Sequence, residues 1–226
     1  MLFNYLILRL LVDIIWKDKF KVAMEVKKSL KPVNYIDAMN LLESRTVDVY
    51  NGKKEELLWI LEHSSIYTAG TSAKDSEIID KKIKVTKTNR GGKITYHGPG
   101  QKVIYFVLNL NNREKNIKKL VNSLEECIIE ILKNYKIESQ KDSKNIGIWV
   151  HKGKDLKKIA AIGIRVKKWI AYHGFSINVC NDLEKYEKII PCGVKEKGVT
   201  SMQDIGVKNF NNIDETIINK FLNVFP

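Results

Sequence analysis

The chain has 226 residues, of which 44% are hydrophobic, so it can bury one good core and is expected to be a folded domain. Its formal net charge is +13, from 39 Lys and Arg against 26 Asp and Glu. Only five of those 39 are arginine, and no zinc-finger or RNA-recognition signature accompanies the charge, which argues against nucleic-acid binding. The lysines therefore either solvate the surface or steer acidic protein partners toward it.

The amino-terminal stretch from Leu2 to Trp16 is strongly apolar but contains Arg9 and Asp13. It is too short and too charged for a membrane span, and it has no small-residue cleavage site of a secretory signal. We therefore expect residues 1–26 to be a dispensable extension and residues 27–226 to form a single domain that does not associate with membranes.

The first half of the chain alternates helical and strand patterns. Apolar residues recur at helical spacing in 35–44, and 57–61 is a short apolar run typical of a buried strand. The run 102–110 is almost continuously apolar, as in a strand buried on both faces. Residues 117–135 have the period of an amphipathic helix of about five turns, which makes Cys127 a helix-face or core residue.

The second half predicts three successive strands, at 146–150, 158–166 and 170–179, with a glycine-containing turn at 152–155, and a closing helix at 213–224. Short neighbouring strands joined by a tight turn indicate an antiparallel meander. Helices and strands in this irregular order predict an α+β fold with a mixed, largely antiparallel sheet flanked by helices.

The three cysteines, Cys127, Cys180 and Cys192, form neither a CxxC pair nor a zinc spacing with histidine. An odd, sparse set of cysteines argues against a disulfide scaffold and indicates a reducing, cytoplasmic location. Cys192 stands in the sequence IIPCGV, where proline fixes the approach and glycine removes bulk from the next amide. This context can display a sulfur atom on a tight turn, as a thiol nucleophile requires.

The most unusual segment is RGGKITYHGPGQ, residues 90–101, with four glycines, a proline, a histidine and an arginine just before a hydrophobic strand. Such a loop lets backbone amides approach a ligand closely. Its Ile94–Gly98 part shares the pattern I-x-Y-H-G with Ile170–Gly174, although nothing around the two segments repeats. Two separate Tyr-His-Gly corners are expected to be two walls of one cavity.

A third segment, KIAAIGIRV, begins with Lys158 and continues with small residues, Ala160, Ala161 and Gly163, which leave room along the strand for a substrate chain. By strand alternation the neighbouring Lys157 belongs to the opposite face.

Together these blocks resemble the lipoyl(octanoyl) transferases, which move an octanoyl group from acyl carrier protein to a lysine of a lipoyl domain. The similarity runs from about Asn34 to Met202 and includes the family's RGGxxTYHGPGQ, HGFxxN and PCG blocks and a final GVTS. It implies that Cys192 carries the acyl group and that Lys158 is its general acid/base partner. His63 stands in EHSS where the family has EHP, so we assign it only to the neighbourhood of the site. The implied substrate-binding residues are Arg90, Gly91, Gly92, Tyr96, His97, Gly98, Ala160, Ala161, Ile162, Gly163, His173 and Gly174.

The resemblance also implies the fold of biotin and lipoate ligases, with a second, smaller sheet. The implied substrates are octanoyl-acyl carrier protein and apo lipoyl domains, those of 2-oxoacid dehydrogenase E2 subunits and the glycine cleavage H protein. These proteins are commonly acidic, which fits the lysine surplus. The incoming thioester is already activated, so no metal or other cofactor is expected, and we expect a monomer.

Two other functions compete with this interpretation. An ATP-dependent lipoate-protein ligase of the same fold typically has an RRxSGGGxVxHDxGN loop and no nucleophilic cysteine, unlike this chain. A non-catalytic acyl-binding or nucleic-acid-binding module would not need Lys158 and Cys192 together.

Overall fold

The computed structural model describes residues 23–190 and 198–226. The α-helices in this part are α2 (Tyr35–Tyr50), α3 (Ile117–Lys133) and α4 (Ile213–Val224), and short 3₁₀ turns are η1 (Asp75–Glu77), η2 (Leu110–Asn112) and η3 (Glu184–Lys188). The strands are β1 (Met24–Lys28), β2 (Glu56–Leu61), β3 (Ile66–Ala69), β4 (Val85–Lys87), β5 (Ile94–His97), β6 (Gln101–Asn109), β7 (Gln140–Lys141), β8 (Ile148–Lys152), β9 (Asp155–Lys167) and β10 (Ile170–Asn178).

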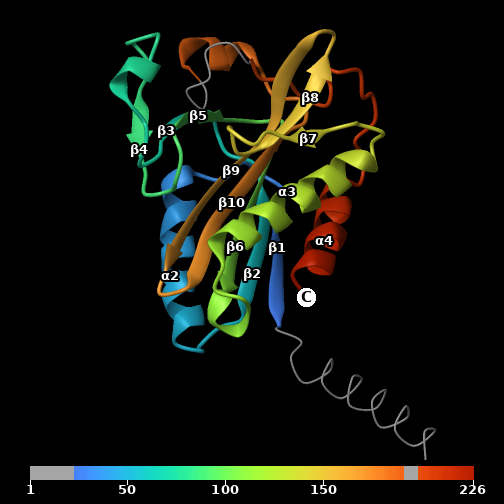
Figure 1. Cartoon of the computed structure of the whole chain (residues 1–226). Coiled ribbons are helices and arrows are strands. Elements are labelled where there is room, and N and C mark those ends of the chain that lie inside the picture. Colours follow the sequence, from blue (N-terminus) through green and yellow to red (C-terminus); the bar gives the residue numbers. More distant parts are fainter. Residues whose placement is uncertain (1–22, 191–197) are drawn as a thin grey trace, which may run out of the picture.

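The main sheet has seven strands in the order β1-β2-β6-β10-β9-β8-β7. Its β1–β2 pair is parallel and the other neighbours are antiparallel. A smaller sheet, β4-β3-β5, lies at one end of the main sheet (Figure 1). This arrangement confirms the predicted α+β fold with a mixed, largely antiparallel sheet and a smaller second sheet.

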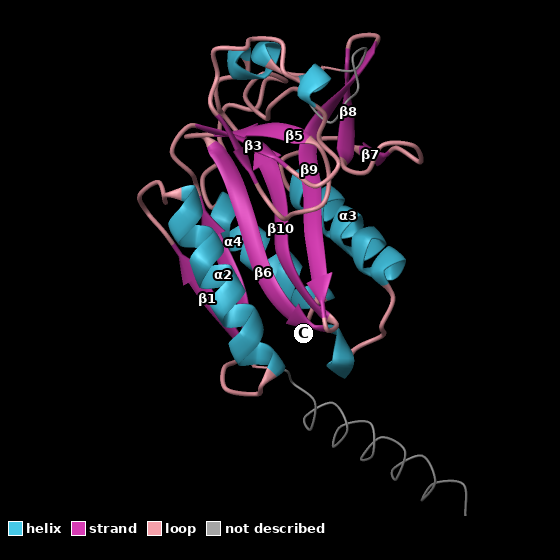
Figure 2. Ribbon diagram, turned by 90° about the vertical axis from the view of Figure 1, so that its left-hand side faces the viewer, coloured by secondary structure: helices cyan, strands magenta, loops and turns pink. Residues whose placement is uncertain are grey.

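Helices cover both faces of the main sheet, with α2 on one face and α3 and α4 on the other (Figure 2). Because successive side chains of a strand point to opposite faces, Leu57 packs on the α2 side and Leu58 on the α3 and α4 side. Strand β6 divides its side chains in the same way. The near-continuous apolar runs of these two central strands therefore follow from burial on both faces.

Helix α2 is longer than the sequence pattern predicts. The Asn34 side chain caps its start by accepting from the backbone N–H of Ile36 at 2.8 Å. The helix continues beyond residue 44 because Thr46 and Val49 are also buried against the sheet. Helix α3 has its predicted extent to within two residues, and Cys127 is fully buried in it, which raises the pKa of this thiol to about 12.

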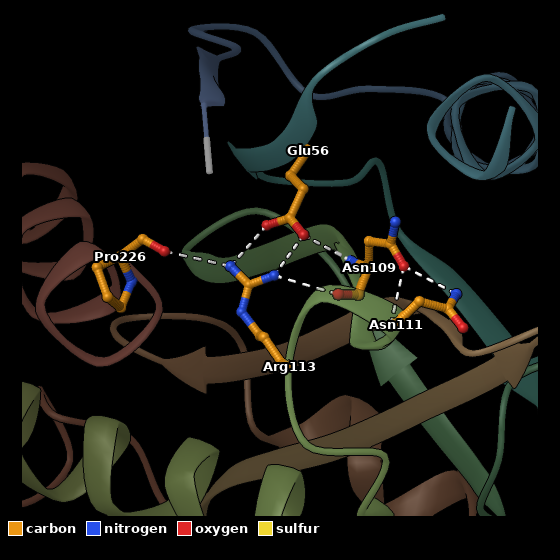
Figure 3. Close-up of polar contacts among 5 residues, drawn as sticks. All are labelled: Glu56, Asn109, Asn111, Arg113 and Pro226. Atoms are coloured by element: carbon orange, nitrogen blue, oxygen red, sulfur yellow. Dashed lines mark hydrogen bonds and ion pairs between the residues drawn. The ribbon is translucent and has the colours of Figure 1, made fainter. Parts of the chain in front are cut away.

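An ion pair joins Glu56, at the start of β2, to Arg113, which follows the η2 turn after the end of β6 (Figure 3). The carboxylate of Glu56 accepts two bonds from the Arg113 guanidinium, at 2.5 and 2.8 Å, and a third from the backbone N–H of Asn109. Arg113 also donates to the backbone carbonyl of Pro226. Two parallel bonds to one carboxylate fix the geometry of the guanidinium, so this pair ties the central strands to the end of the chain.

Strand β1 begins at Met24, so the domain includes residues 24–26, which the sequence analysis assigned to the extension. The apolar stretch from Leu2 to Trp16 and the rest of the expected extension up to residue 22 fall outside the described part of the chain. Among residues 23–190 and 198–226, no helix combines the length and apolarity needed to cross a membrane.

Candidate active site

A cavity of about 630 Å³ lies where β9 leaves its partner β8. Strand β8 pairs with β9 only as far as Ala160, and beyond it the glycine-rich loop approaches instead, with Gly91 N–H donating to the Ile164 carbonyl. The cavity has the size of a small-molecule site. Its apolar lining consists of Ile94, Val103, Ile117, Val121, Ile146, Ile162, Ile164 and Phe175.

Lys158 lies at a bulge in β9. Ile148 pairs with Ala160 but the next residue of β8, Trp149, pairs with Lys158, so β9 contains one extra residue here. A bulge redirects the neighbouring side chain. The Lys158 side chain lines the cavity and is almost fully buried; its Nζ donates to the Ile146 carbonyl at 3.0 Å and lies 4.7 Å from the centre of the Trp149 ring.

Cys192 falls in residues 191–197, outside the described part of the chain. The residues on either side of this segment are anchored. Upstream, Ile190 N–H donates to the Glu77 carbonyl at 2.7 Å. Downstream, Lys158 N–H donates to the Gly198 carbonyl and Thr200 N–H donates to the Lys158 carbonyl, both at 3.0 Å. The chain that follows Cys192 is thus bonded directly to the backbone of Lys158.

The glycine-rich loop is held in place by its own arginine. The Arg90 guanidinium donates to the backbone and hydroxyl oxygens of Thr68 in β3, each at 2.9 Å, and to the Gly91 carbonyl. A side chain at Gly91 would place its Cβ 2.9 Å from the Ile164 carbonyl, and Gly92 has a φ of +92°. Both positions therefore require glycine for the loop to lie against β9.

Three buried histidines, His63, His97 and His173, lie beside or in the cavity wall. Burial lowers the pKa of His63 to about 4, and burial together with nearby positive charge lowers the pKa of His97 and His173 to about 3. All three rings are therefore neutral at pH 7. His63 accepts from the Tyr105 hydroxyl at 2.8 Å, and Tyr105 lines the cavity, so His63 supports the site from behind.

The structure brings most of the residues that the sequence analysis assigned to the site around this one cavity. Both Tyr-His-Gly corners contribute their histidine. The predicted residues that line it are Arg90, Gly91, Gly92, His97, Lys158, Ala161, Ile162, Gly163, His173 and Gly174.

Three predicted residues lie elsewhere. Ala160 lines a small adjoining hollow of about 10 Å³, together with Lys158 and Val199. Tyr96 packs with Ile94 in the core of the small sheet, and Gly98 leaves space for the Tyr96 hydroxyl, which a Cβ there would approach to 2.1 Å. Tyr96 and Gly98 thus support the loop from the side away from the cavity.

The sequence did not predict two polar residues of the site, Tyr105 in the cavity wall and Asn89 behind His173. Tyr105 is hidden in the apolar run of β6, where no pattern distinguished it. Asn89 precedes the glycine-rich loop, and its side-chain oxygen accepts from His173 Nε2 at 2.8 Å. Its amide donates to Glu43 at 2.6 Å, which fixes the orientation of the amide group.

The two described cysteines lack surroundings that favour a thiolate. Cys127 is in the core, and the pKa of Cys180 is raised by partial burial and by the nearby Glu62. Within residues 23–190 and 198–226, no group of three or more His, Cys, Asp or Glu side chains is arranged to hold a metal ion.

Comparison with protein families matches residues 34–225 to the lipoyl protein ligase A/B catalytic domain. Among curated proteins, the octanoyltransferase of Ehrlichia chaffeensis is 43% identical over 85% of this chain and 92% of its own length. The octanoyltransferase of Ehrlichia ruminantium is 45% identical over 89% of this chain and 99% of its own length. The octanoyltransferase of Wolbachia pipientis from Culex pipiens is 44% identical over 85% of this chain and 95% of its own length.

Solved structures with the same fold include lipoate-protein ligase A bound with ATP, with a TM-score of 0.67 and 17% identity over 89% of this chain and 86% of that one. Another is the bipartite lipoate protein ligase of Thermoplasma acidophilum, studied with its E2 lipoyl domain. Its TM-score is 0.67, with 16% identity over 90% of this chain and 84% of that one. At this identity the likeness concerns the fold.

Proposed function

The chain belongs to the lipoyl protein ligase A/B catalytic-domain family, and we propose that it transfers an octanoyl group from octanoyl-acyl carrier protein to a lysine of a lipoyl domain. Octanoyl transfer in protein lipoylation is the activity that its 43–45% identity to octanoyltransferases supports. The acyl-carrier donor and a thioester intermediate on Cys192 are the finer parts of the proposal. The reaction is expected in the cytoplasm.

The observation that carries this proposal is the position of Lys158. Its side chain reaches the cavity, while its backbone bonds to Gly198 and Thr200, the chain that directly follows the Cys192 segment. A lysine in a strand usually faces solvent, but this one is 5% exposed. Lys158 is thus buried beside an apolar cavity and bonded to the chain that follows the Pro-Cys-Gly sequence of Cys192, which supports Lys158 and Cys192 as a catalytic pair.

In the first half-reaction, the Cys192 sulfur attacks the thioester carbonyl carbon of the donor. A new C–S bond forms at Cys192 and the C–S bond to the carrier breaks. Lys158 takes the proton of the Cys192 thiol and returns it to the departing carrier thiolate. An ammonium beside the sulfur favours the thiolate in the meantime.

In the second half-reaction, the amine of the lipoyl-domain lysine attacks the octanoyl thioester. The C–N bond forms, the C–S bond to Cys192 breaks, and the amine proton passes through Lys158 to the Cys192 sulfur. No ATP is consumed, because the thioester already carries the activation.

The apolar part of the cavity fits the octanoyl chain. Burying about seven CH₂ or CH₃ groups at about 0.8 kcal/mol each contributes about 5–6 kcal/mol of binding free energy. Val103, Ile162 and Phe175 are among the side chains available for this contact.

Intact-mass analysis tests the proposal. The protein mixed with octanoyl-acyl carrier protein, without ATP, should gain one octanoyl group on Cys192, and a later addition of an apo lipoyl domain should remove it. Cys192→Ala should gain nothing, whereas Cys127→Ala and Cys180→Ala should react as the unaltered protein does. Labelling of Cys127 or Cys180, or transfer only with free octanoate and ATP, would contradict the proposal, and the second result would favour a ligase.

A further inference from the structure

Two buried side-chain amides, Gln101 and Asn178, bond to each other next to the cavity. Gln101 is 1% exposed and Asn178 is 5% exposed. Gln101 Nε2 donates to Asn178 Oδ1 at 2.9 Å and to the Tyr186 hydroxyl at 2.8 Å. Both residues end the strands that they belong to, at the first position of β6 and the last of β10, and they pair across those strands.

The partners of the two amides fix the direction of each bond. Gln101 Oε1 lies 2.6 Å from His97 Nδ1, and since a carbonyl oxygen only accepts, the His97 proton must be on Nδ1. His97 lines the cavity, so its Nε2 is left as an acceptor there. At the other end of the pair, Asn178 Nδ2 donates to the Thr200 carbonyl at 2.9 Å.

These bonds hold the chain on both sides of residues 191–197. Tyr186 precedes that segment, and its hydroxyl also lies 3.2 Å from Asn178 Oδ1. Thr200 follows the segment, and its N–H donates to the Lys158 carbonyl. One amide pair therefore contacts the chain before Cys192, the chain after it, and, through Thr200, the strand of Lys158.

We propose that Gln101 and Asn178 are positioning residues for octanoyl transfer, which hold both flanks of the Cys192 segment in register with Lys158 and fix the tautomer of His97. The inference rests on the proposed function and adds to it two residues that touch no substrate. Reacting groups must be placed to within a fraction of an ångström, and a displacement of about 1 Å can reduce a rate about 100-fold. In a buried hydrogen-bond network, each bond constrains the others.

Asn178→Asp is the sharpest test, because it keeps the shape of the side chain and its acceptor for Gln101 but replaces the donor to Thr200 with an oxygen. In single-turnover acylation by octanoyl-acyl carrier protein, we expect the rate at saturating donor to fall about 10- to 100-fold. The donor concentration for half-maximal rate should change less than about threefold, because the cavity lining is unaltered.

Asn181→Asp provides a matched control. Asn181 is 4% exposed, lies three residues from Asn178, and its side-chain amide has no hydrogen-bond partner in the described part of the chain. The same substitution there should leave the acylation rate of the folded protein within about threefold. Equal losses in the two variants would mean that a buried carboxylate disturbs this region in general, and would overturn the inference.

Tyr186→Phe keeps the inference testable if Asn178→Asp does not fold, since it removes only one hydroxyl. It should lower the same rate by a smaller factor, about 3- to 10-fold. Where Asn178→Asp also folds, the double variant should lose less than the product of the two single losses, because both changes act on one network. Folded variants with a lower Tm but an unchanged acylation rate would reduce the network to a purely structural role. If the unaltered protein forms no thioester with the donor, the proposed function fails. If the unaltered protein forms the thioester and these variants form it at the same rate, only this inference fails.

Discussion

At the scale of single residues, burial separates two adjacent lysines. Lys158 is buried, lines the cavity and contacts the Trp149 ring, whereas Lys157 is half-buried and does not line the cavity. We expect Lys158→Ala to lower the transfer rate about 10²- to 10⁴-fold, the usual contribution of a general acid/base, and Lys157→Ala to stay near the unaltered rate. Steady-state transfer to an apo lipoyl domain measures both. Equal losses would place the acid/base group on the other face of β9.

The buried histidines predict how stability depends on pH. Their pKa values in the folded protein, about 4 for His63 and about 3 for His97 and His173, lie below the value of about 6.5 in an unfolded chain. Between these values the unfolded state binds more protons, so the free energy of unfolding is highest above pH 6.5 and decreases as the pH falls. Each histidine contributes at most about 1.4 kcal/mol per pH unit to this slope.

Urea unfolding at pH 7.5, 6.5, 5.5 and 4.5 measures the slope. His173→Gln should make it shallower because one buried titrating group is gone, and His151→Gln, which removes an exposed histidine outside the cavity lining, is the control. Carboxylates that titrate near pH 4 contribute to both variants alike, so the comparison isolates the contribution of His173 to the slope. An identical slope in His173→Gln would mean that folding does not lower the pKa of the His173 ring.

At the scale of elements, β1 is the first described strand, and it belongs to the main sheet. It pairs in parallel with β2, and the chain after it supplies Ser29, whose hydroxyl accepts from the Trp59 indole at 3.0 Å. Arg45 in α2 also donates to Glu25 at 2.5 Å. Loss of β1 would leave β2 as an open edge.

Removing residues 1–22 should therefore leave the Tm and the transfer rate near those of the whole chain, whereas removing residues 1–28 should lower the Tm by several degrees or more. Thermal unfolding followed by circular dichroism, with an activity assay on the same samples, compares the two truncations. A large loss in the shorter truncation would show that residues before β1 stabilise the domain.

The elements that the sequence predicted well are those in which burial leaves a clear pattern of apolar residues. Strands β2, β6, β9 and β10 and helices α3 and α4 could be located because burial on one or both faces imposes a clear pattern. Strands β1, β4 and β5 have three to five residues and are stabilised by pairing, which a local pattern does not report.

The same distinction applies to the site. Arg90, Gly91 and His173 stand in recognisable blocks and line the cavity, but Tyr96 stands in the same block and faces the small core, because strand alternation turns it away from His97. The bulge at Lys158 and the bonds of Gln101 and Asn178 depend on chain segments far apart in sequence. Such contacts can be seen only in three dimensions.

At the scale of the whole molecule, the cavity is lined by residues of both sheets, from β5 of the small sheet and from β6, β9 and β10 of the main sheet. The proposed reaction requires two protein substrates to reach this cavity in turn. In the proposed mechanism the acyl group stays on Cys192 after the donor has left and before the acceptor binds, so the two partners would bind one after the other.

The net charge of +13 predicts how the donor finds the enzyme. Acidic partners are attracted over long distances by a positive protein, and salt weakens this attraction because the Debye length falls from about 10 Å at 0.1 M to about 3 Å at 1 M. We therefore expect kcat/KM for octanoyl-acyl carrier protein to fall with ionic strength more steeply than kcat. An uncharged small thioester donor, octanoyl-N-acetylcysteamine, provides the control and should show little salt dependence. A kcat/KM that does not change with salt, together with tight, salt-sensitive binding of DNA or RNA, would instead assign the positive charge to nucleic acid.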